Sequence, residues 1–290
     1  MKTSVGNEAL FTAAEWFQRG REAEEAGDLS SGLHAYNQAV AAESDLPEWF
    51  YRLGCVQRKM GLLTDAVTAF TQAVELDPNQ GRYLTNLGVS LDRLGQREAA
   101  VRAYQKAILC DAASVEAHHN LGAIYAEEGR TAEAIRSFEA AIAVSPDAEG
   151  YHNLGLVHYS MGEYETGLGF FEACIKLADD YALGHYYAGL CLMKKGVYGE
   201  AITRYQQAYR LNPSLVRVHL HVGVCQHKLA KYTEALTSLQ RALESFPEDS
   251  RLHYQLALTY DALRLHQEAR RHYQRSRAVS SARPQGRGRT

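Results

Sequence analysis

The 290-residue sequence predicts an all-α protein built as a stack of repeated helix pairs, and two observations lead to this prediction. First, stretches such as EAIRSFEAAIAV and EALTSLQRALES place apolar residues three and four apart, as on one face of an α-helix, and no segment alternates convincingly as a strand does. Second, the sequence repeats itself at intervals of 33 or 34 residues, which is typical of stacked repeat proteins.

The repeat is marked by a small residue in segments similar to NLG. The marker positions are Gly20, Gly54, Gly88, Gly122, Gly155, Gly189, Gly223 and Ala257. Every interval is 34 residues except the one between Gly122 and Gly155, which is 33. We therefore expect an array of eight repeats over residues 13–283, after a lead-in at 1–12 and before a basic, disordered tail at 284–290. The repeats begin near residues 13, 47, 81, 115, 148, 182, 216 and 250.

Two further positions explain how each repeat packs. A second small residue follows the marker after twelve residues, at Gly32, Ala66, Ala100, Ala134, Gly167, Ala201, Ala235 and Ala269. A bulky residue follows it after sixteen, at Tyr36, Phe70, Tyr104, Phe138, Phe171, Tyr205, Leu239 and Tyr273. We expect two helices in each repeat, which approach closely at the small residues while the bulky side chain fills the space between them.

The turns of each repeat have their own residues. Seven positions after the marker stand Gly27, Gly61, Gly95, Gly129, Gly162 and Gly196, with Ala230 and Arg264 in the last two repeats. Glycine there supplies the left-handed conformation that ends a helix. The second turn is marked by Pro78, Pro146, Pro213 and Pro247, where a helix cannot continue without strain.

This pattern resembles the tetratricopeptide repeat family. The second repeat shows the family's motif as Phe50, Leu53, Gly54, Ala66, Phe70, Ala73 and Pro78. The resemblance extends over about residues 13–283, with departures at Ala257, at Leu239, and at Ser44, Ala112 and Asp179 in place of proline. It implies a right-handed superhelical solenoid of antiparallel helix pairs, in which the first helices line a concave groove.

Several histidines recur at fixed places in the repeat. With the marker counted as position eight, His118, His185, His219 and His253 occupy position four, and His119 and His152 occupy position five. Neighbouring helices lie roughly 8–10 Å apart, whereas zinc ligands lie about 2.0–2.1 Å from one ion. We therefore expect these histidines to pack or to line the groove, and we expect no metal site.

Composition and motifs limit the classes of function. No nucleotide-binding or nucleophile motif is present, so we expect no enzymatic activity and no cofactor. The five cysteines form no C-x-x-C pair, which favours a reduced, cytoplasmic location. The sequence contains no run of 18 apolar residues, so we expect no membrane span. A net charge of −3 gives no reason to expect a nucleic-acid partner.

The resemblance implies that positions two, five, six, nine, twelve and thirteen face the groove. Position six holds Asn86, Asn120 and Asn153, a series similar to the asparagine ladder of the O-linked N-acetylglucosamine transferase array, where such amides hold the backbone of an extended peptide. A carboxamide both donates and accepts, so it can bind any peptide group. The alternative is that these asparagines only face water. The other candidate groove residues are Tyr51, Arg52, Arg82, His119, His152, Tyr186, Tyr187 and Tyr254.

A basic patch is also expected in the second and third repeats. It comprises Arg52, Arg58, Lys59, Arg82 and Arg93, interrupted by Glu48 and Asp92. Two interpretations of this patch stay open at this point. It binds an acidic segment of a partner, or it is a solvated face of mixed charge.

These observations favour a non-catalytic adaptor that binds a peptide or protein partner in its groove. The alternative is a scaffold that assembles end to end, because residues 1–50 carry nine acids and three bases while residues 264–290 carry eight arginines and one glutamate. Two other interpretations of the arginine-rich end stay open. It serves only to increase solubility, or it contacts nucleic acid or an anionic surface. A second alternative is the targeting subunit of a separate enzyme.

Overall fold

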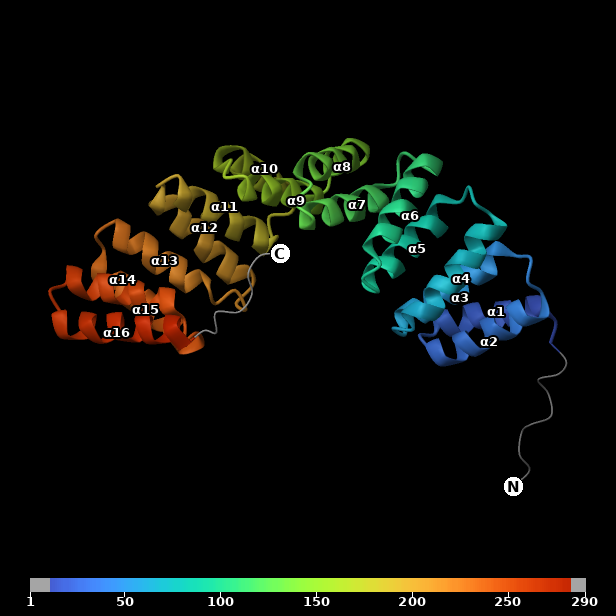
Figure 1. Ribbon diagram of the computed structural model, residues 1–290, viewed down its shortest axis with the longest axis horizontal. Coiled ribbons are helices and arrows are strands. Elements are labelled where there is room, and N and C mark those ends of the chain that lie inside the picture. The colour runs from blue at the N-terminus through green and yellow to red at the C-terminus, as the bar shows by residue number, and fades with distance from the viewer. Residues whose placement is uncertain (1–10, 283–290) are drawn as a thin grey trace, which may run out of the picture. The chain divides into compact units, whose positions relative to one another are not determined.

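The computed structural model describes residues 11–282, and this part of the chain contains sixteen α-helices and no strand (Figure 1). The predicted all-α class is therefore confirmed. None of the described helices is long and apolar enough to span a membrane. The lead-in residues 1–10 and the expected tail at 284–290 lie outside the described residues.

The helices fall into two compact units, residues 1–145 and 146–290. Unit 1 contains α1 (Ala13–Glu25), α2 (Leu29–Ala42), α3 (Pro47–Lys59), α4 (Leu63–Leu76), α5 (Gly81–Arg93), α6 (Arg97–Cys110), α7 (Val115–Glu127) and α8 (Thr131–Val144). Unit 2 contains α9 (Ala148–Ser160), α10 (Tyr164–Leu177), α11 (Ala182–Lys194), α12 (Tyr198–Leu211), α13 (Val218–Lys228), α14 (Tyr232–Ser245), α15 (Ser250–Ala262) and α16 (His266–Ala282).

The repeat pattern does not predict this division, but one feature of the sequence coincides with it. The turn between α8 and α9 has three residues, 145–147, whereas the corresponding turn between α4 and α5 has four, 77–80. The missing residue accounts for the single 33-residue interval of the sequence repeat.

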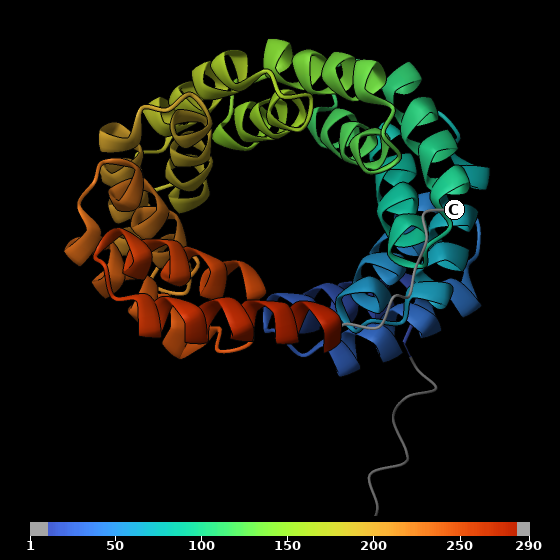
Figure 2. The ribbon, with the colours of Figure 1, turned by 60° about the vertical axis from the view of Figure 1, so that its left-hand side comes forward.

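Each unit consists of two layers of helices. Every odd-numbered helix packs against the even-numbered helix that follows it. Odd-numbered helices also contact one another, α3 with α5 and α5 with α7 in unit 1, and α9 with α11 and α13 with α15 in unit 2. Figure 2 shows both layers in each unit. We call the odd-numbered helices the inner helices, because their closer approach places them on the inside of each unit's curvature.

The marker glycines allow each helix pair to close on its bulky residue. A Cβ atom added at Gly155 would lie 2.6 Å from the Phe171 ring, and one at Gly54 would lie 2.8 Å from Phe70. In the seventh repeat Leu239 replaces the aromatic residue, and a Cβ atom added at Gly223 would lie 2.6 Å from Leu239 Cγ. Phe70, Phe171 and Leu239 are fully buried. A larger side chain at the marker position would therefore displace the buried bulky residue that packs against it.

The first turn keeps its left-handed geometry even where glycine is missing. The six glycines of this turn have φ between 73° and 81°, and Ala230 and Arg264 adopt φ of 59° and 62°. A non-glycine residue in this region costs roughly 1–2 kcal/mol. The last two repeats therefore carry backbone strain that the first six avoid.

Candidate functional site

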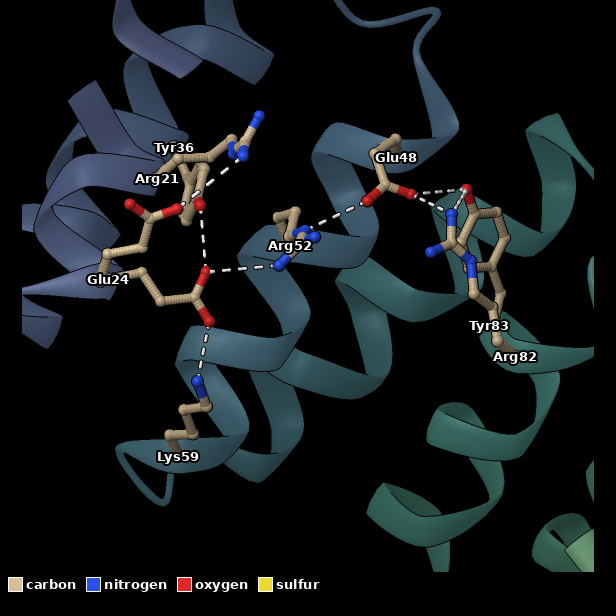
Figure 3. Close-up of polar contacts among 9 residues, drawn as sticks. Arg21, Glu24, Tyr36, Glu48, Arg52, Lys59, Arg82 and Tyr83 are labelled. Atoms are coloured by element: carbon tan, nitrogen blue, oxygen red, sulfur yellow. Dashed lines mark hydrogen bonds and ion pairs between the residues drawn. The ribbon is translucent and has the colours of Figure 1, made fainter. Parts of the chain in front are cut away.

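The inner helices of unit 1 carry a network of charges centred on Glu24. This carboxylate on α1 accepts hydrogen bonds from Lys59 Nζ at 2.7 Å and from the Tyr36 hydroxyl at 3.1 Å (Figure 3). Arg52 Nη1 lies 3.8 Å from it. Burial acts to raise the pKa of Glu24, but the hydrogen bonds from Lys59 and Tyr36 and the positive charges nearby outweigh burial and lower it.

The network continues through Glu48 on α3. Its carboxylate accepts from Arg52 Nε at 3.1 Å and from the Tyr83 hydroxyl at 3.1 Å, and it also pairs with Arg82 on α5 (Figure 3). Two glutamates thus link α1, α3 and α5 through three cationic side chains. We call Glu24, Glu48, Arg52, Lys59 and Arg82 the charge network of unit 1.

The expected basic patch is consequently a face of mixed charge. Arg52, Lys59 and Arg82 are neutralised within the charge network. Arg58 donates from Nη2 to Asn86 Oδ1 at 3.2 Å. Of the patch, only Arg93 is an exposed cation with no ion pair to the described residues. The structure therefore favours the second of the two interpretations left open by the sequence.

Tyr51 contacts Arg82 of this network and packs inside unit 1. Its ring centroid is 5.0 Å from that of Tyr83 and 5.8 Å from that of Phe70. The Arg82 guanidinium carbon lies 4.9 Å from the Tyr51 ring centroid, close enough for a cation–π contact. Tyr51 is half-buried, so most of its ring packs inside unit 1.

The three asparagines of the expected ladder differ in their surroundings. Asn86 is only 9% exposed, and its amide donates from Nδ2 to the Arg82 carbonyl at 2.9 Å while accepting from Arg58. Asn86 therefore neither faces water nor presents a free amide to a peptide, because Arg58 on the preceding inner helix reaches across to bind it. Asn120 in unit 1 and Asn153 in unit 2 are half-buried, and neither amide bonds to another described side chain or carbonyl.

The inner helices of unit 2 carry aromatic rings where unit 1 carries charges. The Tyr186 hydroxyl on α11 lies 3.1 Å from His221 Nε2 on α13. His221 also stacks on Tyr205, with ring centroids 5.3 Å apart. Tyr187 stacks on Phe171 at 5.5 Å and meets Tyr186 edge to face at 5.3 Å. Such contacts are directional as well as apolar.

His152 and His119 lie deeper than position five implied. His152 is 6% exposed among Phe171, Tyr181 and Tyr187, at centroid distances of 5.6, 5.2 and 5.4 Å. Its buried Nδ1 has no hydrogen-bond partner among the described residues. His119 is likewise buried, beside Phe138. Both rings pack against the bulky residue of their own repeat.

Burial holds two histidines of unit 2 in the neutral form. Desolvation lowers the pKa of His152 to about 4. Desolvation and the nearby Arg217 lower the pKa of His221 to about 4 as well. We call His152, Tyr159, Tyr186, Tyr187 and His221 the aromatic floor of unit 2. The two histidines of this floor are uncharged at neutral pH.

Three exposed cations stand on the same inner helices, on α11, α13 and α15. They are Lys194, Lys228 and Arg251, and none forms an ion pair with the described residues. Arg217, just before α13, is different, since it lies 3.7 Å from Asp249 and over the Phe246 ring. Tyr254 on α15 is 47% exposed and touches the Tyr273 ring. We call Lys194, Lys228 and Arg251 the cationic rim of unit 2.

Three of the four position-four histidines have a structural role that the sequence did not reveal, and His219 is the exception. Nε2 of His118, His185 and His253 lies 3.1, 3.1 and 2.9 Å from the carbonyl oxygen six residues earlier, at Ala112, Asp179 and Pro247. A carbonyl only accepts, so Nε2 carries the proton and donates. The recurring six-residue spacing was the signal that could have shown this. Among residues 11–282, no three His, Cys, Asp or Glu side chains are grouped as metal ligands.

The geometry defines a helical-repeat protein whose inner helices offer two chemically different surfaces. Family models described as "TPR repeat" match residues 93–129, 122–162 and 189–230, and models described as "Tetratricopeptide repeat" match residues 17–81, 148–181 and 226–285. Between residues 17 and 285, these models together leave only residues 82–92 and 182–188 unmatched. The chain belongs to the tetratricopeptide repeat family.

Solved structures support the same fold. The C-terminal part of a TPR repeat-containing protein from Cytophaga hutchinsonii aligns with a TM-score of 0.69 at 15% identity, over 83% of this chain and 99% of that one. YrrB, described as "a TPR protein with an unusual peptide-binding site", aligns with a TM-score of 0.56 at 21% identity, over 68% of this chain and 98% of YrrB. MamA aligns with a TM-score of 0.55 at 23% identity, over 59% of this chain and 93% of the MamA chain. No curated protein matches the chain.

Proposed function

We propose that this protein is a non-catalytic adaptor that binds a segment of a partner protein on its inner helices. The observation that carries the proposal is the state of the exposed polar groups there. The half-buried amides of Asn120 and Asn153 have no hydrogen-bond partner within the described protein. The exposed cations of the cationic rim have no ion-pair partner there, and Lys194 has only a cation–π contact with Tyr164. Exposed groups with unused hydrogen-bonding capacity, beside rings that are partly accessible, are typical of peptide-binding surfaces.

The fold supports this role because stacked repeats present an extended surface that only neighbouring repeats need to support. The peptide-binding site named for YrrB agrees with it, although that likeness is one of fold. Of the residues predicted from sequence, Asn153 and Tyr254 are best placed to contact a partner, since each leaves polar or aromatic surface accessible. Asn86, His119 and His152 instead support the fold.

The test is capture of partners from the native cell extract with the immobilised full chain, followed by mass spectrometry. The groove variant Asn153→Ala/Tyr254→Ala should lose at least about tenfold of the captured partner. Its matched control, Leu109→Ala/Lys176→Ala, removes two exposed side chains from the even-numbered helices α6 and α10 and should capture as wild type does. An adaptor role for the inner helices is refuted if only the control loses the partner, or if the groove variant loses none.

A second candidate, head-to-tail association of copies, is favoured by the two ends of the described chain. Helix α16 exposes Arg270, Arg271, Arg275 and Arg277. Helix α1 exposes Glu15, Glu22 and Glu25, with Asp28 just after it. Opposite charges on the two end helices would attract each other between copies.

Light scattering over a range of concentrations distinguishes this candidate from a monomeric adaptor. Association through the ends should be strongest at low salt and should weaken as added salt screens exposed charges beyond roughly 8–10 Å. The charge reversal Arg270→Glu/Arg271→Glu should reduce it further. A monomer at every concentration in low salt excludes this candidate.

A further inference from the structure

Resting on the proposed adaptor role, we infer that unit 2 holds the binding surface and that its ligand is an acidic segment with aromatic or aliphatic side chains between the acids. Unit 1 differs because Arg52, Lys59 and Arg82 are already bound by its own glutamates. The inference follows from the aromatic floor and the cationic rim, taken together.

The aromatic floor provides the apolar part of the site. Tyr159, Tyr186 and Tyr187 are half-buried, so each offers part of its ring to a ligand while the rest packs inside unit 2. Leu156, Met193 and Val224 are also partly accessible on the same inner helices. Rings that are fixed by their neighbours lose little conformational entropy when a ligand binds. This surface suits aromatic or aliphatic side chains of a partner.

The cationic rim selects for negative charge. The inner helices of unit 2 contain two acids, Glu149 and Asp261, and Asp261 is 3.2 Å from His266 Nδ1. They contain three Lys or Arg residues, Lys194, Lys228 and Arg251, all exposed and without an ion pair in the described protein. A ligand carboxylate that meets one of these cations would displace no internal carboxylate, since Lys194 contacts only the Tyr164 ring, with its Nζ 6.0 Å from the ring centroid. In unit 1 it would have to compete with Glu24 or Glu48.

Repeat geometry sets the spacing of the acids. Lys194 and Lys228 occupy the same repeat position on α11 and α13, 34 residues apart. These helices are direct neighbours, since Tyr186 of α11 reaches His221 of α13. Neighbouring helices lie roughly 8–10 Å apart, and an extended chain advances about 3.3 Å per residue. The ligand therefore carries an acid at about every third residue when it binds extended.

The experiment measures binding of labelled twelve-residue peptides to the full chain by fluorescence anisotropy. The probe has aspartate at every third position with phenylalanine and leucine between. One control peptide replaces each aspartate with lysine, and another replaces the apolar residues with serine. Wild type should bind the probe at least about tenfold more tightly than either control, and higher salt should weaken that binding by screening.

A matched pair of variants locates the site. Lys194→Glu/Lys228→Glu should lose at least about tenfold in affinity for the probe and should gain affinity for the lysine peptide. Arg93→Glu reverses the charge at the same repeat position in unit 1, where Arg93 is likewise exposed and without an ion pair, and it should bind as wild type does. Circular dichroism of both variants would check that they remain folded.

Equal binding of acidic and basic peptides, no binding of the probe, or an equal loss from Arg93→Glu would each overturn the inference. These failures are distinct from failure of the adaptor role. If the probe does not bind while Asn153→Ala/Tyr254→Ala still loses its captured partner, the ligand class is wrong and the adaptor role stands.

Discussion

The inner helices of the two units have the same fold and opposite chemistry. In unit 1, α1, α3, α5 and α7 carry eight Asp or Glu and seven Lys or Arg, and ion pairs between neighbouring repeats neutralise most of the cations around Glu24 and Glu48. In unit 2, α9, α11, α13 and α15 carry two acids and three Lys or Arg, and rings provide the contacts between repeats. One repeat architecture thus accepts either charges or aromatic rings at the same positions. Where charges pair with each other they stabilise the stack, and where they do not they are available to a partner.

Acid should destabilise unit 2 before unit 1, and this difference in stability is the largest effect we expect. His152 and His221 are neutral when folded, with pKa values of about 4. The unfolded chain binds more protons below about pH 6.5, so unit 2 should lose stability as pH falls from about 6.5 to about 4, by up to about 3 kcal/mol for each histidine. Unit 1 should respond later, because the lowered pKa of Glu24 makes its contribution disappear only as pH falls below about 4.5.

Hydrogen exchange followed by mass spectrometry at pH 7, 5.5 and 4.5 measures each unit separately, after correction for intrinsic exchange. Protection should fall first in peptides from α9–α13. The variant His152→Phe should flatten the pH dependence of unit 2 even if it alters stability at pH 7. A parallel loss of protection in both units between pH 6.5 and 4.5 would contradict this explanation.

Substitutions in unit 1 should show which of its polar groups hold the stack. Asn86→Ala removes one bond to Arg58 and one to the Arg82 carbonyl, and it should destabilise the protein by about 1–3 kcal/mol. Glu24→Gln should cost about 1–2 kcal/mol, since the Glu24 side chain is only 12% exposed and binds two donors. Asn120→Ala is the matched control from the same repeat position and should change stability by no more than about 0.5 kcal/mol. Urea unfolding measures all three, and equal effects of Asn86→Ala and Asn120→Ala would show that the Asn86 contacts contribute nothing.

The smallest effect concerns the first turn of the last two repeats. Ala230→Gly should stabilise unit 2 by about 0.5–1 kcal/mol, because glycine adopts the left-handed region that Ala230 occupies at φ 59° without steric cost. Gly196→Ala is the converse change in the preceding repeat, at φ 81°, and should destabilise by a similar or larger amount. Thermal unfolding compares them; a destabilising Ala230→Gly would mean that entropy of the unfolded chain outweighs the relief of strain.

The fold could be predicted from sequence because its determinants are local and periodic. Gly155 and Phe171, sixteen residues apart, must meet when a helix pair closes, and they do. The state of Asn86 could not be predicted, because it depends on Arg58, 28 residues away, adopting one particular rotamer. The same holds for the basic patch, where Glu24 on α1 neutralises Lys59 on α3. Periodicity shows which positions share a face, whereas the pairing of long side chains on that face depends on distances that sequence does not contain.

The central claim is that unit 2, and not unit 1, provides the surface that a partner occupies. Tyr51 and Tyr254 stand at the same repeat position on inner helices of unit 1 and unit 2. A photo-cross-linking amino acid placed at each in turn, in the full chain mixed with the native extract, compares the two surfaces directly. We predict a covalent partner adduct at position 254 and little or none at position 51. Equal adducts at both positions, or an adduct at 51 alone, would contradict the claim.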